Sequence, residues 1–230
     1  MGSKKKLQKF AENLTFPNLF QPEYEEVKDG FYLKGKWKRE FFKNENPIVL
    51  ELGCGKGEYT VGLGKKYLHK NFIGVDVKGA RLWRGCKTSN EDKMKNIAFI
   101  RAKIQHIESF FATGEIDEIW ITFPDPQPKK SKQNKRLTSQ VFLNRYANIT
   151  KPDTLFHLKT DNEPLFDYTL EVIEENQHQL LVAVKDLYHN PGFEEVKSIK
   201  THYEILFSDQ GYDINYLEFK LNPKIYSNGE

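Results

Sequence analysis

Cysteine is scarce in this sequence: only Cys54 and Cys86 occur among 230 residues. Two cysteines cannot build a disulfide framework, and neither lies in a cluster with the spacing of metal ligands. No apolar run approaches the roughly 20 residues that a membrane-spanning helix needs. The basic N-terminus is not followed by the apolar core of a signal peptide. We therefore expect a cytoplasmic protein without a membrane anchor or a bound metal.

A large excess of charge of one sign is also lacking. The 35 basic and 32 acidic residues give a net charge of only +3, with 38% hydrophobic residues, as in an ordinary globular protein. So small a net charge is weak evidence for a nucleic-acid partner, and the distribution of charge matters more. Two basic segments stand out, Lys4 to Lys9 and Lys129 to Arg136. A lysine run taken alone is commonly a solvated, flexible face.

Short apolar runs alternate with segments of helical composition from about residue 47 onward. We expect strands at 48–52, 72–76, 97–101, 117–122, 154–159, 180–186, 204–208 and 212–221. We expect helices at 58–68, 78–93, 138–149 and 162–176, and a helical stretch that ends at 111. This alternation predicts an α/β fold with a doubly wound, mostly parallel sheet. The last two strands, separated by a short turn, predict an antiparallel hairpin at one edge.

Residues 1–45 show no clear period and are interrupted by Asn18, Pro22 and Gly30. We expect a partly flexible N-terminal arm there, with at most short helices, and a single domain over residues 46–230.

The segment Glu51-Leu52-Gly53-Cys54-Gly55-Lys56-Gly57 follows an expected strand and opens an expected helix. Glycines at such a point allow a tight turn and a close approach of a ligand to the backbone. The spacing differs from the G-x-G-x-x-G of dinucleotide sites. With an acid just before it, this spacing suits S-adenosylmethionine, which has no pyrophosphate, better than a dinucleotide. An ordinary glycine-rich turn is the alternative.

Asp76 ends the second expected strand. A carboxylate at this place can accept hydrogen bonds from both ribose hydroxyls of a nucleoside cofactor. Taken alone, it is equally suited to cap the next helix, so the ligand interpretation depends on the glycine turn that precedes it.

Three alternate prolines mark the segment Phe123-Pro124-Asp125-Pro126-Gln127-Pro128 as a stiff loop after the fourth expected strand. Ligands of open α/β sheets bind at the carboxyl ends of strands, so the loop would hold Asp125 at a ligand site. A basic run follows directly and could bind phosphates of a nucleic acid. The alternatives are a rigid turn with a solvated acid and a solvated basic loop.

Together these motifs resemble the bacterial tRNA (guanine-N7-)-methyltransferase family, from about residue 47 to the end. That family has E-x-G-x-G-x-G, an acid ending the second strand, F-P-D-P-W-P-K-K with H-N-K-R, then T-D-x-E and T-x-Y/F-E. The corresponding segments here are Glu51 to Gly57, Asp76, Phe123 to Lys130, Asn134 to Arg136, Thr160 to Glu163 and Thr201 to Glu204.

The chain departs from the family pattern at three places. Gln127 stands where Trp is usual, and Ser131-Lys132-Gln133 is about one residue longer than the usual Arg-His. Lys103 stands where an Asp or Asn often lies near the adenine. Because a lysine cannot accept a hydrogen bond from the adenine amino group, we expect the acceptor to be backbone or a neighbour such as Gln105.

The resemblance implies a Rossmann-like class I methyltransferase with a seven-stranded sheet. It implies methyl transfer from S-adenosylmethionine to N7 of a tRNA guanine, the variable-loop guanine 46, with S-adenosylhomocysteine as product. It assigns catalysis to Asp125 and cofactor binding to Glu51, Gly53, Gly55, Gly57, Asp76, Lys103 and Asp125. It assigns the guanine nucleotide to Lys129, Asp161, Thr201, Tyr203 and Glu204, and the tRNA backbone to Lys130, Lys132, Lys135 and Arg136. The partner would be tRNA, and the enzyme a monomer or homodimer.

Guanine N7 carries an in-plane lone pair and needs no deprotonation, so positioning would be the enzyme's main contribution. Two other functions fit parts of the pattern. A methyltransferase acting on a small molecule or protein would share the glycine turn and Asp76 but would not require the basic loop. The other is a non-enzymatic RNA-binding protein with a relict cofactor site, which a cofactor-binding titration would distinguish.

Overall fold

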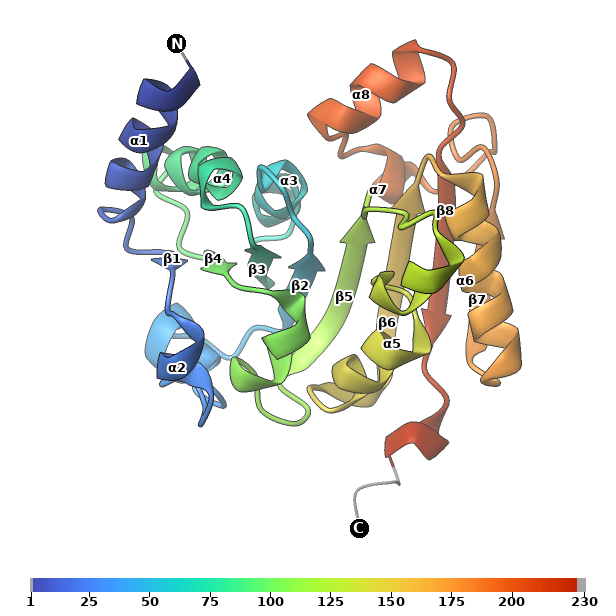
Figure 1. Ribbon diagram of the computed structural model, residues 1–230, viewed down its shortest axis with the longest axis horizontal. Coiled ribbons are helices and arrows are strands. Elements are labelled where there is room, and N and C mark those ends of the chain that lie inside the picture. Colours follow the sequence, from blue (N-terminus) through green and yellow to red (C-terminus); the bar gives the residue numbers. More distant parts are fainter. Residues whose placement is uncertain (1, 227–230) are drawn as a thin grey trace. The chain divides into compact units, whose positions relative to one another are not determined.

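The computed structural model describes residues 2–226, and the chain divides into two compact units, Met1–Ala112 and Thr113–Glu230. Each unit combines parallel strands with helices (Figure 1). Among the described residues, no helix is both long and apolar enough to cross a bilayer.

The N-terminal unit is built on four parallel strands. They are β1 (Leu19–Phe20), β2 (Ile48–Leu52), β3 (Asn71–Asp76) and β4 (Ile97–Arg101), in the order β1-β4-β3-β2. All of β2 and β3 is buried, as expected for parallel strands covered on both faces. The register places Leu52 opposite Val75, so β2 and β3 end together.

Helices of the N-terminal unit connect and cover these strands. They are α1 (Gly2–Asn13), α2 (Tyr24–Val27), the π-helical η1 (Trp37–Phe42), α3 (Glu58–Lys66), α4 (Gly79–Glu91) and the 3₁₀ segment η2 (Ile104–Ser109). The region expected to be an arm is packed into this unit. The Nδ2 of Asn13 in α1 donates to the carbonyl of Gly79 in α4 at 2.8 Å. Trp37 is completely buried, with the ring of Phe20 5.2 Å away.

The C-terminal unit has the strand order β5-β6-β8-β7. The strands are β5 (Ile116–Thr122), β6 (Thr150–Thr160), β7 (Gln179–Val184) and β8 (Asn215–Lys220). Strands β5 and β6 are parallel, and β8 is antiparallel to both of its neighbours. Its helices are η3 (Lys130–Lys135), α5 (Gln140–Ala147), α6 (Glu163–Glu175), α7 (Glu194–Lys197), α8 (His202–Asp209) and η4 (Pro223–Tyr226). The Asn162 side chain caps α6 by accepting from the Leu165 amide at 2.9 Å.

The predicted fold class, an α/β protein with a mostly parallel sheet and an antiparallel edge, is confirmed. The described residues contain eight strands, one more than the family resemblance implies, and the two-residue β1 was not expected from the sequence. The strand predicted at 204–208 is wrong, because these residues lie in α8. Thr201 and Glu204 form a reciprocal capping box, which starts a helix: each backbone amide donates to the other side chain. The antiparallel edge is therefore β7 and β8, not the predicted hairpin.

Candidate functional site

The glycine turn adopts a backbone that only glycine adopts readily. Gly53, Gly55 and Gly57 have φ of +75°, +57° and +69°. A Cβ on Gly57 would lie 2.5 Å from the Phe99 ring, so this glycine permits close packing of α3. A Cβ on Gly55 would meet no heavy atom within 4 Å among the residues that the structure describes. The backbone of Gly55 is therefore approachable by a ligand.

Two carboxylates hold this turn in place. Glu51 is buried, and its Oε2 accepts from the Thr60 amide at 2.8 Å and from the Thr60 hydroxyl, in the first turn of α3. A carboxylate is favoured there because it interacts with the positive end of the helix dipole. The Asp76 carboxylate accepts from the Gly55 amide at 3.0 Å and from the Lys78 amide at 2.7 Å. Since a carboxylate offers about four acceptor positions, Asp76 retains capacity for a ligand's hydroxyls.

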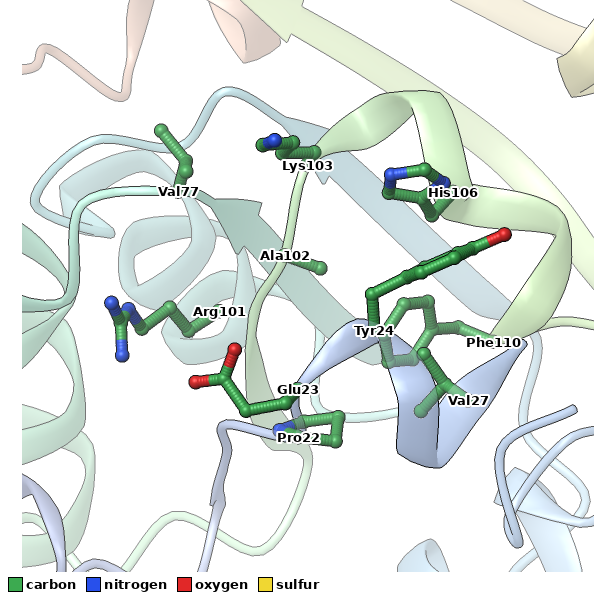
Figure 2. A pocket seen from close by; sticks show the side chains of 10 residues that line it. All are labelled: Pro22, Glu23, Tyr24, Val27, Val77, Arg101, Ala102, Lys103, His106 and Phe110. Carbon is green, nitrogen blue, oxygen red and sulfur yellow. The ribbon is translucent and has the colours of Figure 1, made fainter.

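A pocket of about 230 Å³ opens beside the end of β3 (Figure 2). It is lined by Pro22, Glu23, Tyr24, Val27, Val77, Arg101, Ala102, Lys103, His106 and Phe110. Its walls are partly aromatic, with the rings of Tyr24 and His106 4.3 Å apart. Val77, directly after Asp76, and Ala102 add apolar surface. The size, the aromatic wall and the neighbouring Asp76 suit a nucleoside.

Lys103, which the resemblance assigns to the cofactor site, lines this pocket, and its side chain is exposed. Gln105, the acceptor suggested from the sequence, is not among the lining residues. Glu23 does line the pocket, and Figure 2 shows its carboxylate directed toward Arg101. Glu23 and Tyr24 were not predicted as site residues, because they lie in the N-terminal region, whose sequence shows no periodicity.

In the C-terminal unit, the proline loop is fixed at both ends. Phe123 and Gln127 have φ of +47° and +44°, which is uncommon for residues other than glycine. The Gln127 amide donates to Oδ1 of Asp125 at 3.0 Å, and the Asp125 side chain is exposed. Arg136 donates to the carbonyls of Pro126 at 3.1 Å and Gln127 at 3.3 Å. The loop therefore presents a held carboxylate to solvent.

The basic run after this loop divides into two kinds of residue. The Arg136 guanidinium lies 4.2 Å from the centre of the Tyr168 ring, and its hydrogen bonds hold the proline loop. Lys129, Lys130, Lys132 and Lys135 are exposed on and before η3, and none forms an ion pair within residues 2–226. These four lysines are available to an external anion.

A buried ion pair joins the residue just before the Thr160–Glu163 motif to the last residue of the Thr201–Glu204 motif. The Lys159 Nζ lies 2.6 Å from Oε1 of Glu204, and both side chains are 0% exposed. The Tyr188 hydroxyl donates to the same oxygen at 2.5 Å. Burial lowers the pKa of Lys159, and the charge of Glu204 opposes this shift. Glu204, expected to hold guanine, is thus enclosed by protein groups.

The neighbours of this ion pair are more accessible. Asp161 follows β6 directly and is half-buried, as is Thr201, and Tyr203 is 45% exposed. The Phe123 amide donates to the Lys159 carbonyl at 2.8 Å, so the Asp125 loop leaves β5 beside the end of β6. Within the C-terminal unit, Asp125 and Asp161 therefore both follow the carboxyl ends of paired parallel strands.

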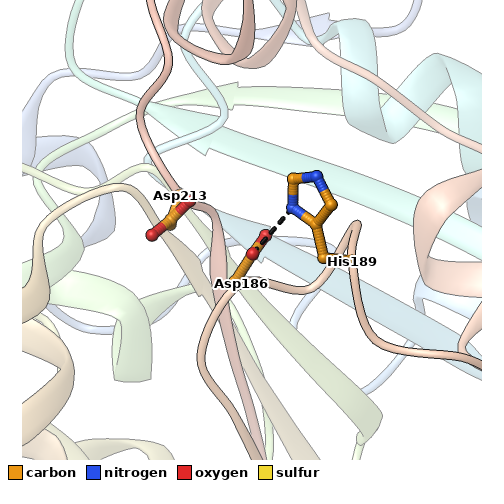
Figure 3. A group of neighbouring side chains, drawn as sticks. All are labelled: Asp186, His189 and Asp213. Atoms are coloured by element: carbon orange, nitrogen blue, oxygen red, sulfur yellow. Dashed lines mark hydrogen bonds and ion pairs between the residues drawn. The ribbon is translucent and has the colours of Figure 1, made fainter.

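A further polar group consists of Asp186, His189 and Asp213, whose possible ligand atoms lie within 4.8 Å of one another (Figure 3). The His189 Nδ1 is 2.7 Å from a carboxylate oxygen of Asp186. This contact raises the pKa of His189. His189 and Asp213 are exposed, and the hydrogen bond to Asp186 is sufficient to explain the arrangement.

A glycine turn tied to the acid that ends the next strand, beside a pocket of nucleoside size, is typical of Rossmann-like enzymes with a nucleoside cofactor, a class that includes methyltransferases. Residues 45–217 match a family described as putative methyltransferase. A solved 16S rRNA methyltransferase, KamB, superposes with a TM-score of 0.62 at 15% identity, covering 80% of this chain and 92% of that one. A geranyl diphosphate C-methyltransferase from Streptomyces coelicolor superposes with a TM-score of 0.53 at 12% identity, covering 81% and 79%. At such identities the likeness shows the fold alone.

The chain belongs to the tRNA (guanine-N7-)-methyltransferase family. It is 53% identical over 223 residues to the tRNA (guanine-N(7)-)-methyltransferase of Christiangramia forsetii, covering 96% of this chain and 100% of that protein. The protein of the same name from Bacteroides thetaiotaomicron is 51% identical, over 95% of this chain and 86% of its own length. The family resemblance predicted from the motifs is therefore confirmed.

Proposed function

We propose that this protein transfers a methyl group from S-adenosylmethionine to N7 of a guanine in tRNA, the variable-loop guanine 46. The observation that carries the proposal is the 53% identity to a tRNA (guanine-N(7)-)-methyltransferase over almost the whole chain. The tied glycine turn in one unit and the exposed, held Asp125 in the other support it.

The N-terminal unit would hold the cofactor, which supplies an already activated methyl group when bound. Asp76 would accept the ribose hydroxyls, and Gly55 would allow close approach to its backbone. Glu51 would act through Thr60, by fixing α3 to the turn. The pocket beside Val77 would enclose the adenine. Because Lys103 has no acceptor, the Glu23 carboxylate would accept from the adenine amino group.

The C-terminal unit would hold the target nucleotide. No general base is needed, because the N7 lone pair is already nucleophilic, so rate enhancement would come from orientation. The methylated base is cationic, and the Asp125 carboxylate would stabilise the developing charge. Asp161 would accept from the N1–H and amino donors of guanine, with Thr201 and Tyr203 beside it. Glu204 would position these residues rather than contact the base.

The lysines after the proline loop would bind the tRNA itself. Lys129, the nearest of them to Asp125 in the chain, would contact the target nucleotide. Lys130, Lys132 and Lys135 would bind backbone phosphates, which carry no sequence information. Arg136 would support tRNA binding by these lysines indirectly, because its guanidinium already donates to the carbonyls of the proline loop.

The test is methylation of bulk unmodified tRNA with labelled S-adenosylmethionine, followed by nucleoside analysis. We expect the label in 7-methylguanosine, and its appearance in another nucleoside would reject the proposal. Asp125→Asn should lower the single-turnover rate by about 100-fold or more while cofactor affinity persists. Asp153→Asn, an exposed Asp at the other end of β6, is the matched control and should leave the rate unchanged.

A further inference from the structure

Positive charge is concentrated on two helices of the N-terminal unit, which are separate in sequence from the basic loop already described. Residues 2–13 and 78–91 contain eight lysines and arginines and only two glutamates. Their net charge is +6, whereas the whole chain carries only +3. These segments form α1 and α4 with its N-cap Lys78, and we call their solvent side the α1/α4 face.

The structure holds α1 on α4 by specific contacts. Besides the buried bond from Asn13 to the Gly79 carbonyl, the Trp83 Nε1 donates to Glu12 at 2.7 Å. The Lys9 ammonium lies 4.5 Å from the centre of the Trp83 ring. The N-terminal lysines therefore belong to a docked helix, not to the flexible face that a lysine run alone indicates.

The two glutamates neutralise little of this charge. Glu12 lies 3.9 Å from Lys87, and Glu91 lies 4.0 Å from the same ammonium. Both carboxylates therefore interact with Lys87, and Glu12 also interacts with Lys9. Five other cations are exposed and form no ion pair within residues 2–226: Lys5, Lys6, Lys78, Arg81 and Arg84.

The α4 cations are spaced along one side of the helix. Lys78, Arg81 and Arg84 recur every three residues, so they project from neighbouring positions on one surface. At a rise of 1.5 Å per residue they span about 9 Å. A nucleic-acid strand carries a phosphate about every 3.4 Å of its axis, so this row could meet more than one phosphate.

We propose that the α1/α4 face binds backbone phosphates of tRNA outside the target nucleotide. This inference rests on the proposed function, since it extends the tRNA contact beyond the lysines of η3. Lys78 lies two residues after Asp76, so the face begins next to the proposed ribose site. An anionic membrane fits less well, because it requires an apolar face in addition to charge. Phe10 and Trp83 pack between α1 and α4, which leaves Leu7, 66% exposed, as an isolated apolar side chain on α1 rather than an apolar face.

The test is a quadruple variant, Lys5→Gln, Lys6→Gln, Arg81→Gln and Arg84→Gln, which leaves Lys78 and the Asp76 contact intact. The matched control is Lys28→Gln, Lys36→Gln, Lys93→Gln and Lys95→Gln, which removes the same charge from other exposed sites of the same unit. Affinity for unmodified tRNA is measured across a salt series for both variants. Cofactor affinity and thermal unfolding are measured beside it.

We expect the face variant to bind tRNA about 10- to 100-fold more weakly. Its log–log salt slope should fall by about 3, given roughly 0.7–0.9 for each lost phosphate contact. Its cofactor affinity and its methylation rate at saturating tRNA should match those of the unaltered protein.

An equal loss of tRNA affinity in the control variant, or an unchanged salt slope in the face variant, would overturn the inference. So would face-dependent binding to phosphatidylserine vesicles with unchanged tRNA affinity. Failure of the unaltered protein to form 7-methylguanosine would reject the proposed function separately, because tRNA affinity is measured directly.

Discussion

Replacing Lys159 by Met removes one partner of an ion pair that is wholly excluded from solvent. Met has a similar length and fills the space, but the Glu204 carboxylate then remains buried with the Tyr188 hydroxyl and the Thr201 amide as donors. Leaving one charge of a buried pair without its counter-charge typically destabilises a protein by about 3–5 kcal/mol. In a chain of this size, each kcal/mol lowers the midpoint of thermal unfolding by about 2–4 °C. We expect a decrease of roughly 6–20 °C.

The chain offers a control of the same chemistry and distance. Lys185 also lies 2.6 Å from a glutamate, Glu163, but these side chains are 51% and 61% exposed. Exposed pairs contribute about 0–1 kcal/mol, so Lys185→Met should lower the midpoint by no more than about 4 °C. Adding Glu204→Gln to Lys159→Met should recover part of the lost stability, because it removes the buried charge. The assay is calorimetric or urea unfolding of the four proteins. Equal effects of Lys159→Met and Lys185→Met would refute this reasoning, since the Lys159 pair is buried whereas the pairs of Lys185, which include Asp167 at 3.0 Å, are exposed.

Three further predictions follow from the N-terminal turn and from a buried histidine. Asp76→Ala should weaken S-adenosylmethionine binding at least tenfold in isothermal calorimetry, and unchanged affinity in the folded variant would contradict its proposed role. Gly57→Ala should destabilise the fold by about 2–4 kcal/mol through its left-handed backbone and the Phe99 clash, whereas Gly55→Ala should cost about 1–2 kcal/mol in urea unfolding. Burial lowers the pKa of His178 from 6.5 to about 4, so the unfolded chain binds the proton more readily. The stability that neutral His178 provides is therefore complete above pH 6.5 and is lost as pH falls toward 4. In His178→Gln, the free energy of unfolding should depend less steeply on pH over that range. An unaltered slope would contradict the role assigned to His178.

The core strands and the glycine turn were predictable from sequence because their signals are local. The strands at 48–52 and 97–101 have the predicted bounds, since each is an apolar run apart from Glu51 and Arg101, as expected for a strand covered on both faces. Asp76 was placed correctly at the end of β3. Glycine recurs at alternate positions after β2 because all three positions have a positive φ, which other residues rarely adopt.

The remaining features depend on contacts between distant residues. Ile205 and Leu206 favour a strand by composition, yet the capping box starts α8, and these two side chains are exposed rather than buried. Helix α1 is largely polar and contains a lysine run, so its stability comes from docking, as with the Trp83–Glu12 bond. No local pattern indicates that Glu12 and Trp83 meet.

The buried ion pair also explains how two motifs far apart in the sequence can act together. Lys159 directly precedes Thr160-Asp161, and Glu204 ends Thr201-His202-Tyr203-Glu204. Because the 2.6 Å contact joins β6 to α8, it sets the position of Asp161 at the end of β6 relative to the start of that helix. Glu204 can therefore act on the proposed nucleotide site by positioning its neighbours, without contact with the base. Removing its charge should alter the affinity for the nucleotide through Asp161 and Tyr203, which are accessible, rather than through a lost bond of its own.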